Sequence, residues 1–205
     1  NTYNMSDLVE KYTVYNSYSY ADFIPTLIPI DSKDIFNMFA GYKYVHDSKF
    51  THINRIEIWI NHIRDVICDG NEHYAKILTQ WMAHIVQRGT EKSFAVVITG
   101  EEGTGKSILY EFLAECIGKN LCTQVADMNR LTQNHNNHLK NRLLINVSEC
   151  TNEPTLKEVS TMKGVITDLE LTINPKGMPI YSINNYARYL ITSNYERCIR
   201  PAAKD

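Results

Sequence analysis

The stretch GEEGTGKS, Gly100 to Ser107, constrains the fold of this chain more than any other. It fits the phosphate-binding pattern G-x-x-x-x-G-K-[ST], in which glycines let the backbone curl so that successive N–H groups face a phosphate. Residues 94–98 before it have the length and β-branched content of a buried strand, and residues 108–117 after it have helical spacing up to Gly118. The order of strand, glycine loop and helix predicts an α/β fold with a nucleoside triphosphate site at this loop.

The lysine and the serine of the loop match the two charged parts of such a ligand. Lys106 can reach the β and γ phosphates, and the Ser107 hydroxyl can ligate Mg²⁺. A surface turn with a solvated lysine is the competing interpretation, and the flanking strand and helix argue against it. We therefore expect ATP and Mg²⁺ as cofactors, bound by Gly100, Gly103, Thr104, Gly105, Lys106 and Ser107.

Composition limits the class of protein. The 205 residues are 43% hydrophobic and 21% charged, which suits a globular chain with one medium domain and an appendage. A net charge of -2 excludes a wholly basic surface that wraps nucleic acid, but it allows a few lysines focused in a channel. Five cysteines without a C-x-x-C pair favour free thiols in a reducing compartment over disulfides or zinc ligands.

The sequence contains no segment typical of export or membrane insertion. It starts at Asn1 without a signal-like stretch, and its apolar runs are too short to span a bilayer. We expect an internal piece of a longer protein that is not secreted. His135 and His138 lie in a polar stretch, where a solvated loop or helix face is favoured over a metal site.

The chain divides at about residue 91. Residues 1–30 are rich in tyrosine and asparagine and are interrupted by prolines, which predicts an irregular or weakly β lead-in. Residues 31–90 form a helical segment, because apolar residues recur at helical spacing from 53 to 87 around a break at 69–72. We expect the tryptophan and isoleucine stripe of this helical hairpin to pack in a core. Residues 91–205 form the α/β core, with a central, mostly parallel sheet.

A carboxylate follows the second predicted strand of the core. Residues 143–147 are apolar and lead directly into Ser148 and Glu149. Enzymes with this kind of phosphate loop hold at this place the group that orients the attacking water or the hydrated Mg²⁺. Glu149 is therefore the candidate general base and, with Ser107, the candidate metal ligand. The usual pair here is two acids, and Ser148 replaces the first; Glu153 and a plain surface role for Glu149 are the alternatives.

Two further features follow in the core. Residues 169–183 have the pattern of a β-hairpin with asparagine, proline and glycine in its turn and Lys176 at the tip. Residues 189–192 predict another buried strand, which ends at Ser193 and Asn194. The Asn194 amide would lie at the same edge of the sheet as Lys106, where it can hydrogen-bond a γ-phosphate or the attacking water.

The series of glycine loop, strand with Glu149, lysine-tipped hairpin and strand with Asn194 resembles the A, B, B-prime and C motifs of superfamily 3 helicases. The segments 36–42 and 69–83 are similar to the poxvirus-type and phage-type primase-helicase branch. The resemblance covers about residues 31–200. It implies a P-loop, AAA-like core with a five-stranded sheet, a hexameric ring that hydrolyses ATP at subunit interfaces, and passage of single-stranded DNA through the channel.

The resemblance also implies roles for individual residues. Glu149 would activate water, Asn194 would sense the γ-phosphate, and Lys176 together with Lys163 would contact the DNA backbone. It implies a viral, phage or plasmid replication protein that works in the cytoplasmic or nuclear compartment of the host cell, without a membrane partner. A primase domain fused upstream would fit that branch.

The resemblance places an arginine finger near the end of this sequence. Arg197 and Arg200 are candidates, and we expect the finger to lie beyond residue 205. A chain without it would bind nucleotide but hydrolyse it slowly, because such a finger supplies about 10³ to 10⁵ of the rate in related phosphoryl transfer.

Two other classes of function remain open from the residues alone. A small-molecule kinase shares the phosphate loop but needs an arginine-rich lid, and the stretch between Ser107 and Glu149 has few arginines. A non-catalytic module, in which the nucleotide only stabilises an assembly, fits the replacement of an acid by Ser148. ATP hydrolysis assayed with and without single-stranded DNA separates the three classes.

Overall fold

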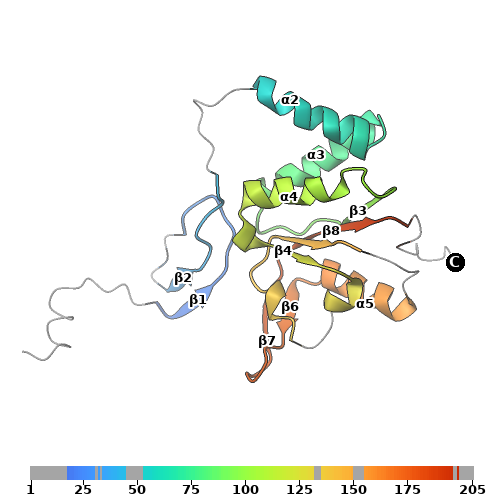
Figure 1. Cartoon of the computed structure of the whole chain (residues 1–205). Helices are drawn as coiled ribbons and strands as arrows, with labels where there is room; N and C mark the ends of the chain where they lie inside the picture. The colour runs from blue at the N-terminus through green and yellow to red at the C-terminus, as the bar shows by residue number, and fades with distance from the viewer. Residues whose placement is uncertain are drawn as a thin grey trace, which may run out of the picture.

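The protein is a mixed α/β structure with one central parallel sheet (Figure 1). A computed structural model describes residues 18–30, 32, 34–44, 53–131, 135–149, 155–195 and 198. Its longer helices are α2 (Ile53–Asn61), continued by the π-helix η1 (His62–Ile67), then α3 (Glu72–Gln87), α4 (Lys106–Ile117) and α5 (Leu156–Thr167). Short 3₁₀ helices are η2 (Lys119–Leu121), η3 (Met128–Leu131) and η4 (Asn137–Leu139).

The central sheet has four strands within the described part of the chain, and each strand runs parallel to its neighbours. In spatial order the strands are β3 (Val96–Thr99), β8 (Arg188–Ser193), β5 (Leu144–Val147) and β4 (Cys122–Val125). The five-stranded sheet expected from the helicase resemblance is thus represented by four strands here. Three of them lie within two residues of their predicted positions, but β4 was not predicted, because only two of its four residues are apolar.

Helices cover both faces of the sheet (Figure 1). Leu144 and Leu190 join a core cluster with α3 and α4, whereas Ile145 and Ile191 join a second cluster with α5. Successive side chains of a strand point to opposite faces, so the central strands β5 and β8 are buried throughout. This three-layer arrangement holds the ends of the strands at fixed positions.

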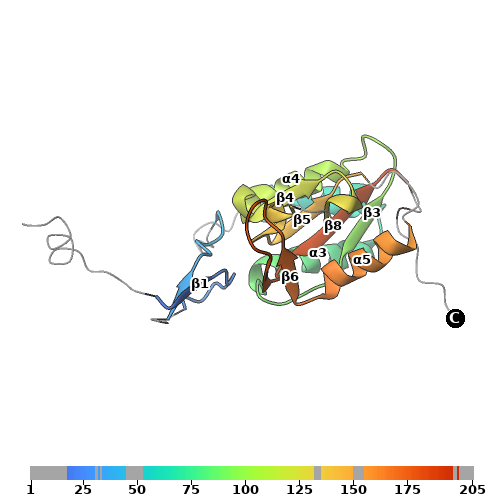
Figure 2. The same cartoon turned by 90° about the horizontal axis from the view of Figure 1, so that it is seen from below.

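Two smaller sheets accompany the central one. The antiparallel hairpin β6 (Glu170–Ile173) and β7 (Tyr181–Asn184) has the predicted form, with Gly177 in the left-handed region at its turn (φ 73°). The parallel pair β1 (Tyr20–Asp22) and β2 (Ile35–Asn37) lies beside the C-terminal end of α4 (Figures 1 and 2). The segment 31–90, predicted as helical, therefore also contains a strand.

The helical hairpin breaks where the sequence predicted. Asn71 caps α3, and its side chain accepts a hydrogen bond from Tyr74 N at 3.1 Å. The prediction that the apolar stripe of this hairpin packs in a core is only partly correct, because Ile56 and Ile60 are about half exposed while Trp81 is buried. The reason is that α3 and α4 lie between α2 and the sheet, so α2 has one face without a neighbour among the described elements (Figure 1).

A buried arginine fastens this helical hairpin to the sheet. Arg188, at the start of β8, is fully buried and donates to Gly89 O (2.8 Å), to Tyr186 O (2.7 Å) and to Arg88 O. Its Nη2 also lies 3.1 Å from His84 Nδ1. Burial lowers the pKa of Arg188 to about 10. The guanidinium thereby satisfies carbonyl groups beyond the last turn of α3.

We expect Arg188→Met to lower the free energy of unfolding by about 2–5 kcal/mol, since it leaves buried carbonyl groups without donors. Chemical denaturation measures the difference. Arg130→Met on the exposed side of η3 is the matched control and should stay within about 0.5 kcal/mol of the wild type. An equal effect of both variants would contradict the fastening role of Arg188.

Candidate functional site

The glycine loop joins the end of β3 to the first residue of α4, as the sequence predicted. Gly103 and Gly105 have φ angles of 81° and 83°, in the left-handed region where only glycine is unstrained. Thr104 Oγ1 donates to Glu101 O at 2.8 Å and fixes the curl of the loop. The N–H groups of the first turn of α4 have no partner within the helix and point toward the loop, so this end of the helix can bind an anion.

Lys106 lies at the centre of this loop. Its Nζ donates to Gly100 O (2.8 Å), Glu101 O (2.6 Å) and Thr104 Oγ1 (3.3 Å), and the residue is 9% exposed. The ammonium is thus held against the loop backbone rather than extended into solvent. Ser107 is exposed on the first turn of α4, one residue further on.

Strand register brings the other two candidate residues to the same edge of the sheet. Thr99 pairs with Ser193, and Gly100 N donates to Ser193 O at 3.2 Å, so Asn194 follows at the level of Gly100. Val147 pairs with Ile191, which puts Glu149 two residues further, at the level of Ser193. Since neighbouring strands are about 4.8 Å apart and β8 lies between β3 and β5, Asn194 lies between the glycine loop on one side and Glu149 on the other. Both side chains are exposed.

Ser148, at the position where a second acid was expected, belongs to the framework. Its hydroxyl donates to Val125 O at 3.3 Å, and its backbone N–H donates to the same carbonyl at 2.9 Å. Its own carbonyl accepts from Thr192 Oγ1 at 3.4 Å. Ser148 therefore ties β5 to both neighbouring strands, and Glu149 is the carboxylate that directly follows β5.

Ser107 and Glu149 are the residues that could hold Mg²⁺. A magnesium ion in such sites keeps several waters and takes only one or two protein ligands besides phosphate oxygens. No group of three His, Cys, Asp or Glu side chains that could bind a metal occurs in the described ranges. The donor set here thus suits a hydrated Mg²⁺ held mainly by phosphates.

The residues expected to contact DNA lie elsewhere. Lys176 is exposed at the tip of the β6–β7 hairpin, which connects to the amino end of β8 and so lies toward the opposite end of the sheet from the glycine loop (Figures 1 and 2). Asn136 anchors the hairpin by donating to Thr172 O (2.8 Å) and accepting from Asn174 N (2.9 Å). Lys163 is exposed on α5.

Three of the alternatives lie outside the described residues, namely Glu153, Arg197 and Arg200. His135 is exposed as expected, but His138 is partly buried, and burial lowers its pKa. Cys68, Cys116, Cys122 and Cys198 are free thiols. Within the described ranges, none of the helices has the length and apolar character that crossing a bilayer requires.

One residue that the sequence did not indicate lies against the loop. His62 approaches Gly105 so closely that a Cβ there would lie 2.8 Å from its Cε1. His62 is far from the loop in sequence, and a lone histidine in a helix gives no signal of such a contact. Only the packing of η1 beside the loop reveals it.

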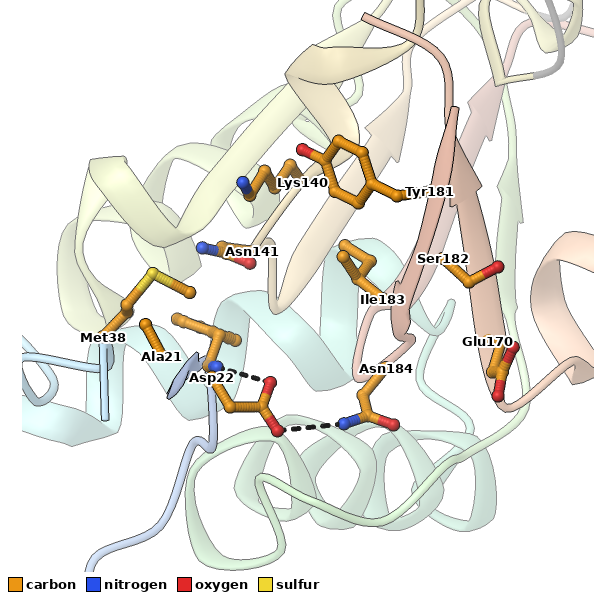
Figure 3. A pocket seen from close by; sticks show the side chains of 11 residues that line it. Ala21, Asp22, Met38, Lys140, Asn141, Glu170, Tyr181, Ser182, Ile183 and Asn184 are labelled. Carbon is orange, nitrogen blue, oxygen red and sulfur yellow. Dashed lines mark hydrogen bonds between the residues drawn. The ribbon is translucent and has the colours of Figure 1, made fainter. Parts of the chain in front are cut away.

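A cavity of about 320 Å³ lies between β1 and β7, at the amino end of the sheet (Figure 3). Lys140 Nζ lies 5.1 Å from the centre of the Tyr181 ring, and Asn184 Nδ2 donates to Asp22 Oδ2 at 3.3 Å across it. Glu170 also lines it, so the lining carries two carboxylates and one ammonium. This charge disfavours an anionic ligand, which distinguishes the cavity from the glycine loop.

Comparisons with known proteins find a relative in a phage. Over 121 residues the chain is 28% identical to a DNA primase-polymerase of Nitratiruptor phage NrS-1, covering 58% of this chain and 17% of the relative. The chain thus spans about a sixth of the length of this relative.

Solved structures of the NrS-1 C-terminal region share the fold. One matches with a TM-score of 0.65 and 21% identity over 84% of this chain and 42% of that chain. Another matches with a TM-score of 0.61 and 24% identity over 71% of this chain and 36% of that chain. A family model, described as a family of unknown function (DUF5906), matches residues 98–205. Because this match covers just over half of the chain, the protein belongs to the DUF5906 family.

Proposed function

We propose that this chain contains the ATP-hydrolysing P-loop core of a phage-type DNA replication protein, a helicase or translocase of the superfamily 3 type. One observation supports it above the others. The glycine loop with Lys106, the amide of Asn194 and the carboxylate of Glu149 follow three neighbouring strands at the carboxyl edge of one parallel sheet, with Asn194 in the middle. Ligands of open α/β sheets bind at this edge.

The roles of the residues follow from their chemistry. The N–H groups of the loop bind the phosphates, Lys106 contacts the β and γ phosphates, and Ser107 with Glu149 holds hydrated Mg²⁺. Glu149 also accepts the proton of the attacking water, and Asn194 donates to the γ-phosphate. Mg²⁺ held by these residues would neutralise the charge that develops on the transferred phosphoryl group.

The phage relative supports a role in DNA replication. A DNA primase-polymerase acts on DNA, and the fold of this chain is similar to the C-terminal region of that protein. For this chain we propose that residues 31–90 and 91–205 serve the ATPase, that the full-length protein has a primase domain upstream, and that six copies form a ring in the host cell. An arginine finger, Arg197, Arg200 or a residue beyond 205, would then complete the site of a neighbouring subunit.

ATP hydrolysis by the full-length protein, measured with and without single-stranded DNA, tests the proposal. Turnover that increases with DNA is the expected result, because translocation couples the two sites. Turnover that requires a small-molecule acceptor would assign a kinase instead. ATP binding without any turnover would leave a module in which the nucleotide only stabilises an assembly.

Lys176→Ala tests the DNA contact, since this residue is remote from the phosphates. Neutralising it should weaken binding of single-stranded DNA for all sequences alike and flatten the salt dependence by roughly 0.7 log units for each DNA phosphate that is no longer neutralised. ATP binding should not change. A salt titration of DNA binding by the full-length protein measures both quantities.

Lys119→Ala is the matched control, because Lys119 is also exposed but lies after α4, away from the hairpin. Lys163→Ala is expected to resemble Lys176→Ala with a smaller effect. Parallel titration lines of equal affinity for wild type and Lys176→Ala would remove the hairpin from the mechanism.

A further inference from the structure

Three aromatic rings stack between α4 and the glycine loop. The Phe112 ring on α4 lies 3.8 Å from the Trp59 ring on α2, with an angle of 25° between their planes. The Trp59 ring in turn lies 5.6 Å from the His62 imidazole, at 28°. The last ring of this stack contacts the loop, because a Cβ on Gly105 would lie 2.8 Å from His62 Cε1 and 3.2 Å from Nε2.

The Nε2 atom of the His62 imidazole has an unusual environment. Nε2 is buried and has no hydrogen-bond partner among the residues that the structure describes. Buried polar atoms nearly always have a partner, so an exception beside a ligand site suggests that the ligand is the partner. His62 is also the first residue of the π-helix η1, and such single π turns occur frequently at functional sites.

His62 lies on the side of the glycine loop where the nucleoside end of a bound nucleotide is expected. Glu149 and Asn194 follow β5 and β8, on one side of β3, and mark the γ-phosphate end. The other side of β3 is its outer edge, where Ile67 of η1 and Leu78 of α3 line a groove along the strand. A nucleotide whose γ-phosphate faces β8 and β5 extends its nucleoside toward this outer side.

The first turn of α4 supports this orientation. Ile108 is 48% exposed, and its Cγ2 lies 3.7 Å from the same Cβ position on Gly105 that His62 approaches. Ile108 and His62 therefore flank the loop directly beyond Lys106 and Ser107, where the α-phosphate and the sugar follow the β and γ phosphates.

We propose that His62 contacts the nucleoside end of the bound nucleotide through Nε2, and that Trp59 holds the imidazole in place by stacking. The pair then distinguishes a nucleotide from free polyphosphate, which the loop and Lys106 bind without it. This inference rests on the proposed ATP site and adds a specificity residue to it.

Binding of ATP and of inorganic tripolyphosphate to the full-length protein, measured by calorimetry, tests the proposal. His62→Phe keeps the stack but removes Nε2, and it should raise the dissociation constant for ATP about three- to tenfold while leaving that for tripolyphosphate unchanged. His62→Gln retains a hydrogen-bonding group and should lie closer to wild type. His73→Phe, at an exposed histidine of α3, is the matched control and should change neither constant.

The outcomes separate this inference from the proposed function. A wild type that binds ATP no differently from His62→Phe would overturn the role of His62 and leave the ATP site intact. Equal losses of affinity for ATP and tripolyphosphate would assign His62 to loop packing and would also overturn it. Failure of the wild type to bind either ligand would remove the ATP site itself.

The wild type provides a second measurement that requires no folded variant. ATP should change the emission of Trp59, because its stacking partner engages the nucleoside, whereas tripolyphosphate should not. Trp81 is a buried residue of α3 and contributes a constant background, and Trp59→Phe should abolish the change. Identical spectra with the two ligands would contradict the proposal.

Discussion

Glu149→Gln is expected to leave ATP binding intact and to lower ATP turnover at least about a hundredfold. The amide keeps the shape of the side chain and one oxygen for the hydrated Mg²⁺, but it cannot accept a proton from water. The neighbouring Ser148 cannot replace it, because a serine hydroxyl is not a base and this one donates its proton to Val125 O. Steady-state turnover and ATP binding of the full-length protein, measured side by side, separate the two effects.

Glu102→Gln is the matched control for this experiment, since Glu102 is an exposed glutamate of the glycine loop itself. Its turnover should stay close to that of the wild type. Wild-type turnover in Glu149→Gln would assign the general base to another residue, and Glu153 would be the next to change.

Lys106→Ala is expected to weaken ATP binding by about 1.5–3 kcal/mol for each charge-assisted hydrogen bond that it removes, or roughly 10- to 150-fold per bond. In the structure the ammonium is already bonded to Gly100 O, Glu101 O and Thr104 Oγ1, so phosphate binding exchanges these hydrogen bonds for stronger ones. Unlike the His62 variants, Lys106→Ala should also weaken tripolyphosphate binding. Calorimetry measures both constants.

Lys106→Met controls for the loss of packing, because it keeps most of the buried side-chain stem but removes the charge. It should bind ATP as poorly as Lys106→Ala while retaining more of the thermal stability of the wild type. Unchanged ATP affinity in both variants would exclude the glycine loop as the nucleotide site.

Elements defined by local chemistry were predictable from the sequence. The helix α4 lies between the capping glycines Gly105 and Gly118, and α3 begins after the Asn71 cap. Such caps act on backbone groups only a few residues away, so they can be recognised from the sequence. The hairpin with Lys176 at its tip followed from its turn residues in the same way. The buried strands β3, β5 and β8 were visible as short apolar runs.

The candidate site likewise has parts that the sequence could indicate and parts that only the tertiary structure shows. The glycine loop, Glu149 and Asn194 could be named from the sequence because each follows a recognisable strand, and parallel strands end at one edge of a sheet. The strand order that makes Gly100 and Asn194 neighbours comes only from the hydrogen bonds between β3 and β8.

The sequence by itself therefore determined the glycine loop, its helix, the lysine-tipped hairpin and the buried strands, because periodicity and turn chemistry act between residues close in the chain. Only the tertiary structure decided the place of β4, the burial of Arg188 and the contact of His62 with Gly105. These depend on which distant segments share a face or an edge, and close packing, not local propensity, selects those partners.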